Sequence, residues 1–206
     1  MHRALAFLGL GLAGAAVLGI VGRRKATACL SFSVLMGASV GFTAFFLLFP
    51  KSYTPAAFLA KQGIYDSLLF GMSLELSFRV FSAFRGIADR ARKILGGLVL
   101  LSTAAIFFLT PQAAYSEFWR YQPSVTTAGV WCLTSVSLLI VWYQIPVAAF
   151  TRAIVMAYVP YQVVFVILLD IIRRQGWGVV SEVNLANAVA YDVMVAYLAY
   201  AAWRKD

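Results

Sequence analysis

Residues 4–22 read ALAFLGLGLAGAAVLGIVG, and the basic triplet Arg23-Arg24-Lys25 follows directly. A helix needs roughly 20 apolar residues to cross the hydrocarbon core of a bilayer. This run is too long for the apolar part of a signal peptide, and no small-residue cleavage site follows it. We therefore predict a first transmembrane helix that ends at a basic boundary.

The composition of the whole chain agrees with a membrane protein. Hydrophobic residues make up 62% and charged residues only 12%, whereas roughly a quarter of the residues of a soluble domain are charged. The net charge of +9 comes from short basic clusters between apolar runs, which is typical of loops that orient a membrane protein. We expect the lipid bilayer as a partner and exclude nucleic acid.

Further apolar windows predict an all-α, polytopic membrane bundle of seven transmembrane helices that forms one domain over residues 1–206. The expected spans are 4–22, 26–49, 63–84, 94–110, 124–144, 147–172 and 179–203. Six or eight crossings stay open, because only Ile145-Pro146 divides the fifth run from the sixth. The segments 51–62 and 112–123 are expected outside, and the second resembles an interfacial helix with an aromatic belt.

The Lys and Arg residues predict the orientation. The first, third and fifth loops and the C-terminal tail carry ten of them, against six on the opposite side. The richer side faces the cytoplasm, so we expect the N-terminus outside and the C-terminus inside a cytoplasmic membrane. A basic face on the inner side is a predicted docking site for a partner protein; it consists of Arg85, Arg90, Arg92 and Lys93.

Small residues at helical spacing form a ridge on each of the first two expected spans. The two ridges are Gly11, Ala15 and Gly19, and Ser33, Gly37 and Gly41. Small side chains let helix backbones approach each other inside a bilayer. We expect both ridges to pack inside the bundle, and the oligomeric state stays open.

The third expected span contains MSLELSFRVF (72–81), in which Glu75 and Arg79 lie four residues apart. Ser67 and Gly71 continue the same helical stripe. A charge near the centre of a transmembrane helix costs roughly 2.5–3.5 kcal/mol, so we expect this stripe to face the interior and the two charges to pair.

The seventh expected span contains SEVNLANAVAYD (181–192), which places Asn184, Asn187, Tyr191 and Asp192 on one side of a helix. We expect Glu75 and Asp192 at a similar depth in the middle of the membrane. Two acids would then share one arginine, so one acid is expected to be protonated. The predicted polar core consists of Glu75, Arg79, Asn184, Asn187, Tyr191 and Asp192.

Several chemistries are excluded by the residues present. His2 is the sole histidine, and Cys29 and Cys132 are isolated packing residues within expected spans. No metal site, no cofactor and no Ser–His catalysis is expected. An intramembrane aspartyl protease would need two acids at one level, but Asp66 lies about 13 Å along the helix from Glu75. We therefore do not expect an enzyme.

The strings ELSFRVFSAF (75–84) and NLANAVAYDVMVAYLAYAAW (184–203) resemble a group of small, uncharacterised seven-span membrane proteins of environmental bacteria, acidobacteria in particular. A Glu-x-x-x-aromatic/Arg third helix and an Asn…Ala-Tyr-Asn/Asp last helix recur in that group. The resemblance implies the seven-span layout and carries no function. Asp192 stands where a second Asn is expected.

These observations predict a non-enzymatic membrane protein. It would be a sensor or an accessory subunit whose polar core binds a small ligand or couples to a partner protein. The alternative is a transporter of a small solute or of protons that uses Glu75 and Asp192 as carriers. The polar core can also be a structural network that fixes the register of the helices.

Overall fold

The computed structural model describes residues 2–83 and 115–205, and every regular element there is a helix. Short 3-10 helices are η1 (Lys25–Ala28), η2 (Pro50–Ser52) and η3 (Trp177–Val179). The long α-helices of the described chain are α1 (His2–Gly22), α2 (Leu30–Leu48), α3 (Pro55–Ala83), α5 (Tyr115–Trp142), α6 (Ala149–Gln175) and α7 (Val180–Trp203). The predicted all-helical class is confirmed.

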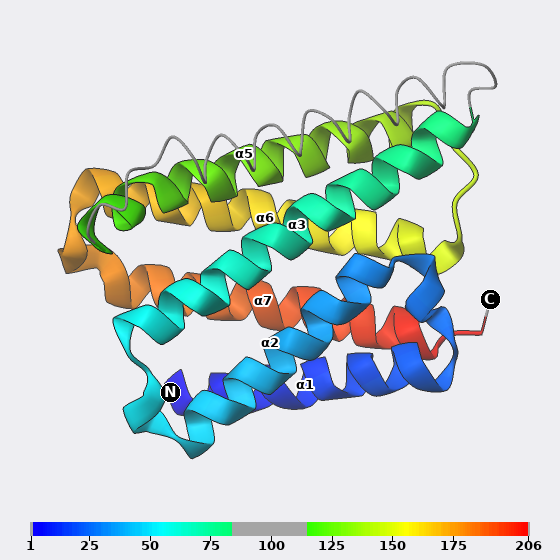
Figure 1. Ribbon diagram of the computed structural model, residues 1–206. Coiled ribbons are helices and arrows are strands. Elements are labelled where there is room, and N and C mark those ends of the chain that lie inside the picture. Colours follow the sequence, from blue (N-terminus) through cyan, green and yellow to red (C-terminus); the bar gives the residue numbers. More distant parts are fainter. Residues whose placement is uncertain (1, 84–114, 206) are drawn as a thin grey trace.

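The long helices form a closed ring in which α1 packs on α2, α2 on α3, α3 on α5, α5 on α6, α6 on α7 and α7 on α1. Figure 1 shows that α1, α3, α5 and α7 run in one direction and that α2 and α6 run back. We call the end where α1 and α7 finish and α2 and α6 begin the η1 end. The opposite end, which holds η2 and η3, is the η2 end.

Five of the described helices are long enough and apolar enough to cross a membrane: α1, α2, α5, α6 and α7. Large apolar side chains cover the outside of these helices; Leu18 and Trp131 are each 66% exposed and Trp142 is 83% exposed. Such a surface suits lipid and would be a liability in water. The five helices support a multi-pass membrane protein.

The third and fourth expected spans have different outcomes. Residues 63–83 do form a helix, but α3 is not among the five candidates, because Asp66, Glu75 and Arg79 interrupt its apolar sequence. The expected span at 94–110 lies outside the described residues. The count of seven crossings therefore stays a prediction.

The face that α3 buries differs from the expected one. Its most buried side chains are Met72, Leu76 and Val80, at 0, 0 and 2% exposure, and they lie four residues apart. The side chains of Glu75 and Arg79 are 23 and 33% exposed. The prediction that the charged stripe faces the centre of the bundle is wrong, because apolar packing occupies that face and the charges lie toward the start of α2.

Two helices begin earlier than expected. At the start of α3, Thr54 Oγ1 accepts the N–H of Ala57 at 3.2 Å, and Pro55 occupies the first helical position, where a missing N–H costs nothing. The segment 51–62 is therefore largely helical. The expected interfacial helix at 112–123 is not separate, because α5 already begins at Tyr115.

The turn between α5 and α6 lies where the sequence predicts a break. Gln144 has a φ of 47°, its N–H donates to Val141 O at 3.3 Å, and the N–H of Ile145 donates to Ile140 O at 3.1 Å. These are the bonds of a Schellman motif, with Gln144 in the position that favours glycine. Pro146 then prevents the helix from continuing.

The two small-residue ridges behave differently. A Cβ added at Gly19 would lie 2.9 Å from Ala202 Cβ, and Trp203 Nε1 donates to Ala15 O at 3.0 Å. Ala15 and Gly19 of the α1 ridge therefore pack against α7, and internal packing is confirmed for these two residues. A Cβ would meet no neighbour within 4 Å at Gly11, Gly37 and Gly41. Internal packing is thus wrong for Gly11 of the α1 ridge and for Gly37 and Gly41 of the α2 ridge, within the part of the chain that the structure describes.

Candidate functional site

The carboxylate of Glu75 caps the start of α2. Its Oε1 accepts the N–H of Leu30 at 3.0 Å, and its Oε2 accepts the N–H of Ser31 at 3.1 Å. The first N–H groups of a helix have no partner within the helix, and their partial positive charge favours an anion. Cys29, the residue at the N-cap position, makes no side-chain cap bond of its own. Glu75 therefore supplies from α3 the cap that α2 lacks.

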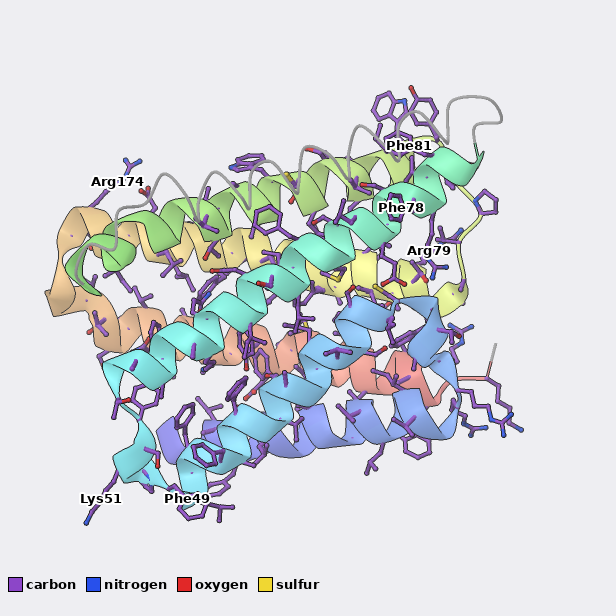
Figure 2. All side chains as sticks on the ribbon, in the orientation of Figure 1. Phe49, Lys51, Phe78, Arg79, Phe81 and Arg174 are labelled. Carbon is purple, nitrogen blue, oxygen red and sulfur yellow. The ribbon has the colours of Figure 1, made fainter. Side chains whose placement is uncertain are left out.

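Two basic side chains hold the same corner of the bundle. Arg79 Nη2 donates to Glu75 Oε1 at 3.3 Å and to Thr27 O at 3.0 Å. Lys25 Nζ donates to Ala201 O at 3.3 Å and to Arg204 O at 2.6 Å, where a cation is favourable because these carbonyls end α7. Figure 2 shows Arg79 near the η1 end of α3 and Arg174 at the opposite end of the bundle.

Cys29 completes the surroundings of Glu75. Its Sγ donates to Glu75 Oε2 at 3.5 Å, and the residue is fully buried in the turn before α2. Burial raises the pKa of the Cys29 thiol to about 12, so the proton stays on the sulfur. The expectation of a buried packing cysteine fits Cys29 and is wrong for Cys132, which is exposed.

Glu75 and Asp192 do not lie at one level. Glu75 binds Leu30 at the start of α2, whereas Tyr191, the neighbour of Asp192, hydrogen-bonds to Ser39 in the middle of α2. Nine residues of α-helix separate these levels by roughly 13 Å. The predicted shared site of two carboxylates is therefore wrong, and with it the argument for a proton held between them.

The predicted polar residues of α7 separate into two groups. Tyr191 Oη lies 3.1 Å from Ser39 Oγ, the side-chain oxygen of Asn187 is buried, and Asp192 is only 8% exposed. These three lie inside the bundle. Asn184 is exposed and does not belong to the site, because the bundle covers a narrower arc of α7 than the sequence pattern suggested.

Asp192 lines a cavity of about 150 Å³ between α1, α2 and α7. Gly9 of α1 provides room for the carboxylate, because a Cβ at Gly9 would lie 2.5 Å from Asp192 Oδ1. Asp192 Oδ2 is buried and has no hydrogen-bond partner among the described residues. A buried polar atom without a partner costs free energy unless a ligand or water satisfies it. This combination makes the cavity the candidate ligand site.

The sequence does not predict a second polar contact, which joins Asp66 of α3 to Thr126 of α5. Thr126 Oγ1 of α5 donates to Asp66 Oδ1 of α3 at 2.9 Å, and Gln62 Nε2 donates to the same oxygen at 3.3 Å. Asp66 is 7% exposed. The sequence placed Asp66 on α3 but gave no sign of its partner on α5. Because these donors satisfy Oδ1, the contact joins α3 to α5 and does not form a binding site.

A larger groove of about 540 Å³ lies between α6 and α7. Pro160 and Tyr161 line it from α6, and Met194 and Tyr197 line it from α7. No charged side chain contributes to the groove, so it offers contact with apolar molecules and little chemistry. The smaller cavity at Asp192 is the better candidate because it holds an unsatisfied acid.

The described residues include no group of three or more His, Cys, Asp or Glu side chains that could hold a metal ion. Comparison with protein-family models, curated proteins and solved structures gives no match to the chain. The resemblance to small seven-span bacterial proteins therefore stays a prediction. Any function has to be argued from the site itself.

Proposed function

We propose that this chain is a non-enzymatic, multi-pass membrane protein of the sensor or accessory-subunit kind, and that the Asp192 cavity binds its small ligand. The observation that carries the proposal is the buried Asp192 Oδ2, which lacks a partner among the described residues and belongs to a side chain that lines the cavity. An ionisable residue inside a membrane bundle is a functional candidate by default.

The same proposal includes the orientation of the protein. It crosses a cytoplasmic membrane seven times, with the N-terminus outside and the C-terminus inside. Support comes from the sequence count of ten Lys and Arg residues on the predicted inner side against six on the other, because such an excess is typical of an inner face. Of these residues, six on each side belong to the described chain, and Lys51 and Arg174 lie at the end opposite η1 in Figure 2. The excess therefore comes from Arg85, Arg90, Arg92 and Lys93, which lie outside the described residues.

A sensor of this kind needs a partner for its output. Every regular element among the described residues belongs to the helical bundle or joins two of its helices, so the signal would pass to a second protein. We place this partner at the basic face of Arg85, Arg90, Arg92 and Lys93, which lies outside the described residues.

Transport is the second candidate, and it is favoured by the position of Asp192 near the middle of α7. Glu75 is unsuited to carry a proton or a solute. Its protonation would weaken the cap on the N–H groups of Leu30 and Ser31 and the pair with Arg79. A transporter built on this bundle would therefore use Asp192 without Glu75.

Native mass spectrometry of the protein, purified from its own host in a mild detergent, tests the proposal. A small molecule bound to the 22.5 kDa chain that Asp192→Asn loses supports the ligand site. A second protein in the complex supports the accessory subunit.

A bare chain would contradict both readings of the proposal. Proton or solute flux in liposomes that depends on Asp192 would then establish transport in its place. A bare chain without flux would leave Asp192 as a structural residue.

A further inference from the structure

The Asp192 cavity is partly open, and its volume limits how much of a ligand it can enclose. Its volume is about 150 Å³, which is about the size of an engineered apolar cavity that binds benzene. A ligand of roughly six non-hydrogen atoms would therefore fill it. A nucleotide, a sugar or a lipid headgroup with its glycerol is too large for this space.

Most of the wall is aliphatic. Leu5 and Leu10 of α1, Val40 of α2 and Ala188 of α7 line it. Contact with such a wall favours a ligand that carries a hydrocarbon body, because burial of apolar surface is favourable. A purely polar ligand would leave this wall without a complementary surface.

The polar part of the lining consists of oxygen atoms. Besides Asp192, side-chain oxygens come from Ser39, Thr43 and Tyr191. Ser39 Oγ and Tyr191 Oη lie 3.1 Å apart and share a hydrogen bond, whereas Asp192 Oδ2 has no partner among the described residues. A buried carboxylate oxygen is best satisfied by a group that brings both positive charge and N–H donors.

Metal ions fit this lining less well. Calcium takes six to eight oxygen ligands, several of them from carboxylates, and magnesium needs an octahedral set. Asp192 is the one acid in the lining of this cavity. A bare alkali ion would also leave the aliphatic wall uncovered.

We infer that the Asp192 cavity binds a small primary alkylammonium ion, with its ammonium group on the Asp192 carboxylate and its carbon chain against Leu5, Leu10 and Val40. The inference rests on the proposed function, because it names the chemical class of the ligand for the same cavity. An amine of about four or five carbons matches the volume.

The test uses n-butylammonium chloride as the probe and isothermal titration calorimetry of the purified protein in detergent, in an amine-free potassium phosphate buffer. The wild type should bind the probe. It should bind n-butanol, a neutral molecule of the same chain length, at least tenfold more weakly, because a hydrogen bond to a charged group contributes a factor of this order.

Three variants locate the binding. Asp192→Asn keeps the shape and removes the charge, and it should lose at least tenfold in affinity. Gly9→Ala should lose a similar factor, because its Cβ would compete for the space of Asp192 Oδ1. Gly11→Ala is the matched control on the same helix, since its Cβ meets no neighbour within 4 Å, and it should bind like the wild type. If Asp192→Asn does not fold, Gly9→Ala and Gly11→Ala still give the comparison.

The outcomes separate the inference from the proposed function. Equal affinity for n-butylammonium and n-butanol, or unchanged affinity in Asp192→Asn, overturns the alkylammonium site. If n-butylammonium does not bind but native mass spectrometry finds another small molecule that depends on Asp192, the ligand class is wrong and the ligand site stands. If neither experiment finds a ligand, the alkylammonium site and the ligand site both fall, and the accessory-subunit reading then stands only if native mass spectrometry finds a second protein.

Discussion

Glu75 on α3 accepts the backbone N–H of Leu30, the first residue of α2, at 3.0 Å. The two residues are 45 positions apart in the chain, so the cap of one helix is a tertiary contact. Because an anion at a helix N-terminus is favourable only while the helix and the anion stay in place, this contact couples the start of α2 to the position of α3.

Glu75→Gln should lower the free energy of unfolding by about 1–3 kcal/mol. The amide keeps one acceptor but replaces the other with an N–H₂ group that faces helix N–H donors, and it loses the charge pair with Arg79. Thermal unfolding in detergent measures the change. Ser67→Ala is the control, because Ser67 is exposed, and it should stay within about 0.5 kcal/mol of the wild type. Equal stability of the two variants would contradict the capping role.

Lys25→Met should loosen the last turn of α7. The ammonium group of Lys25 bonds to Ala201 O and Arg204 O, and its loss should cost about 1–2 kcal/mol. Hydrogen exchange should accelerate at the amides of residues 200–205. Arg24→Met, at an exposed neighbour, should leave that exchange unchanged, and equal protection in both variants would refute the contact.

Gln144→Gly should stabilise the protein by about 0.5–1 kcal/mol, because glycine adopts a positive φ without the Cβ penalty. Gln144 has a φ of 47° and is exposed. Gln144→Ala retains the Cβ and serves as the control. The midpoint of thermal unfolding should rise for the glycine variant alone; a fall would show that the Gln144 side chain has a role of its own.

Cys29 should resist N-ethylmaleimide at pH 8 while the protein is folded. Burial raises the pKa of Cys29 to about 12 from an ordinary value of 9.0, so roughly one thiol in ten thousand is ionised and reactive at pH 8. The thiol should react after denaturation. The variant Cys132→Ala leaves Cys29 as the sole cysteine and lets mass spectrometry assign the rate; rapid modification of the folded variant would contradict the buried thiol.

The raised pKa of Cys29 also sets the sign of a pH effect. The folded state holds the thiol proton more tightly than the unfolded state, so this group stabilises the fold below about pH 9 and loses that contribution as the pH rises toward 12. The difference in stability between the wild type and Cys29→Ala should shrink over this interval. A growing difference would contradict it.

The helical class and most helix positions follow from the sequence, because long apolar runs leave few alternatives. The start of α3 could also be predicted from the sequence, because Thr54 and Pro55 form a helix-start signal. The predicted span began later, at residue 63, because it was placed by apolar residues alone. The charged pair on α3 was correctly expected to form. The place of this pair in the bundle differs from the prediction. Helical periodicity gives the face on which a residue lies, but it gives neither the neighbours of the residue nor its level in the bundle.

The candidate site illustrates the same limit. The sequence singled out Asp192 and Tyr191, but it gave no reason to connect them with Gly9 on α1 or Ser39 on α2. Those contacts depend on how α1, α2 and α7 meet. Gly9 contributes because it lacks a Cβ, which leaves room for the Asp192 carboxylate. Asn184 was included because a helical arc of polar residues does not show how much of that arc a neighbouring helix covers.

The close packing of α1 against α7 has a consequence for biosynthesis. Ala15 and Trp203, which meet across this interface, are 188 residues apart. At the usual rate of translation, a ribosome would take roughly 10–40 s to produce the chain between them. During that interval α1 would sit in the membrane with its glycine-lined surface turned to lipid or to an insertion chaperone, and its lasting neighbour would arrive only when α7 is inserted.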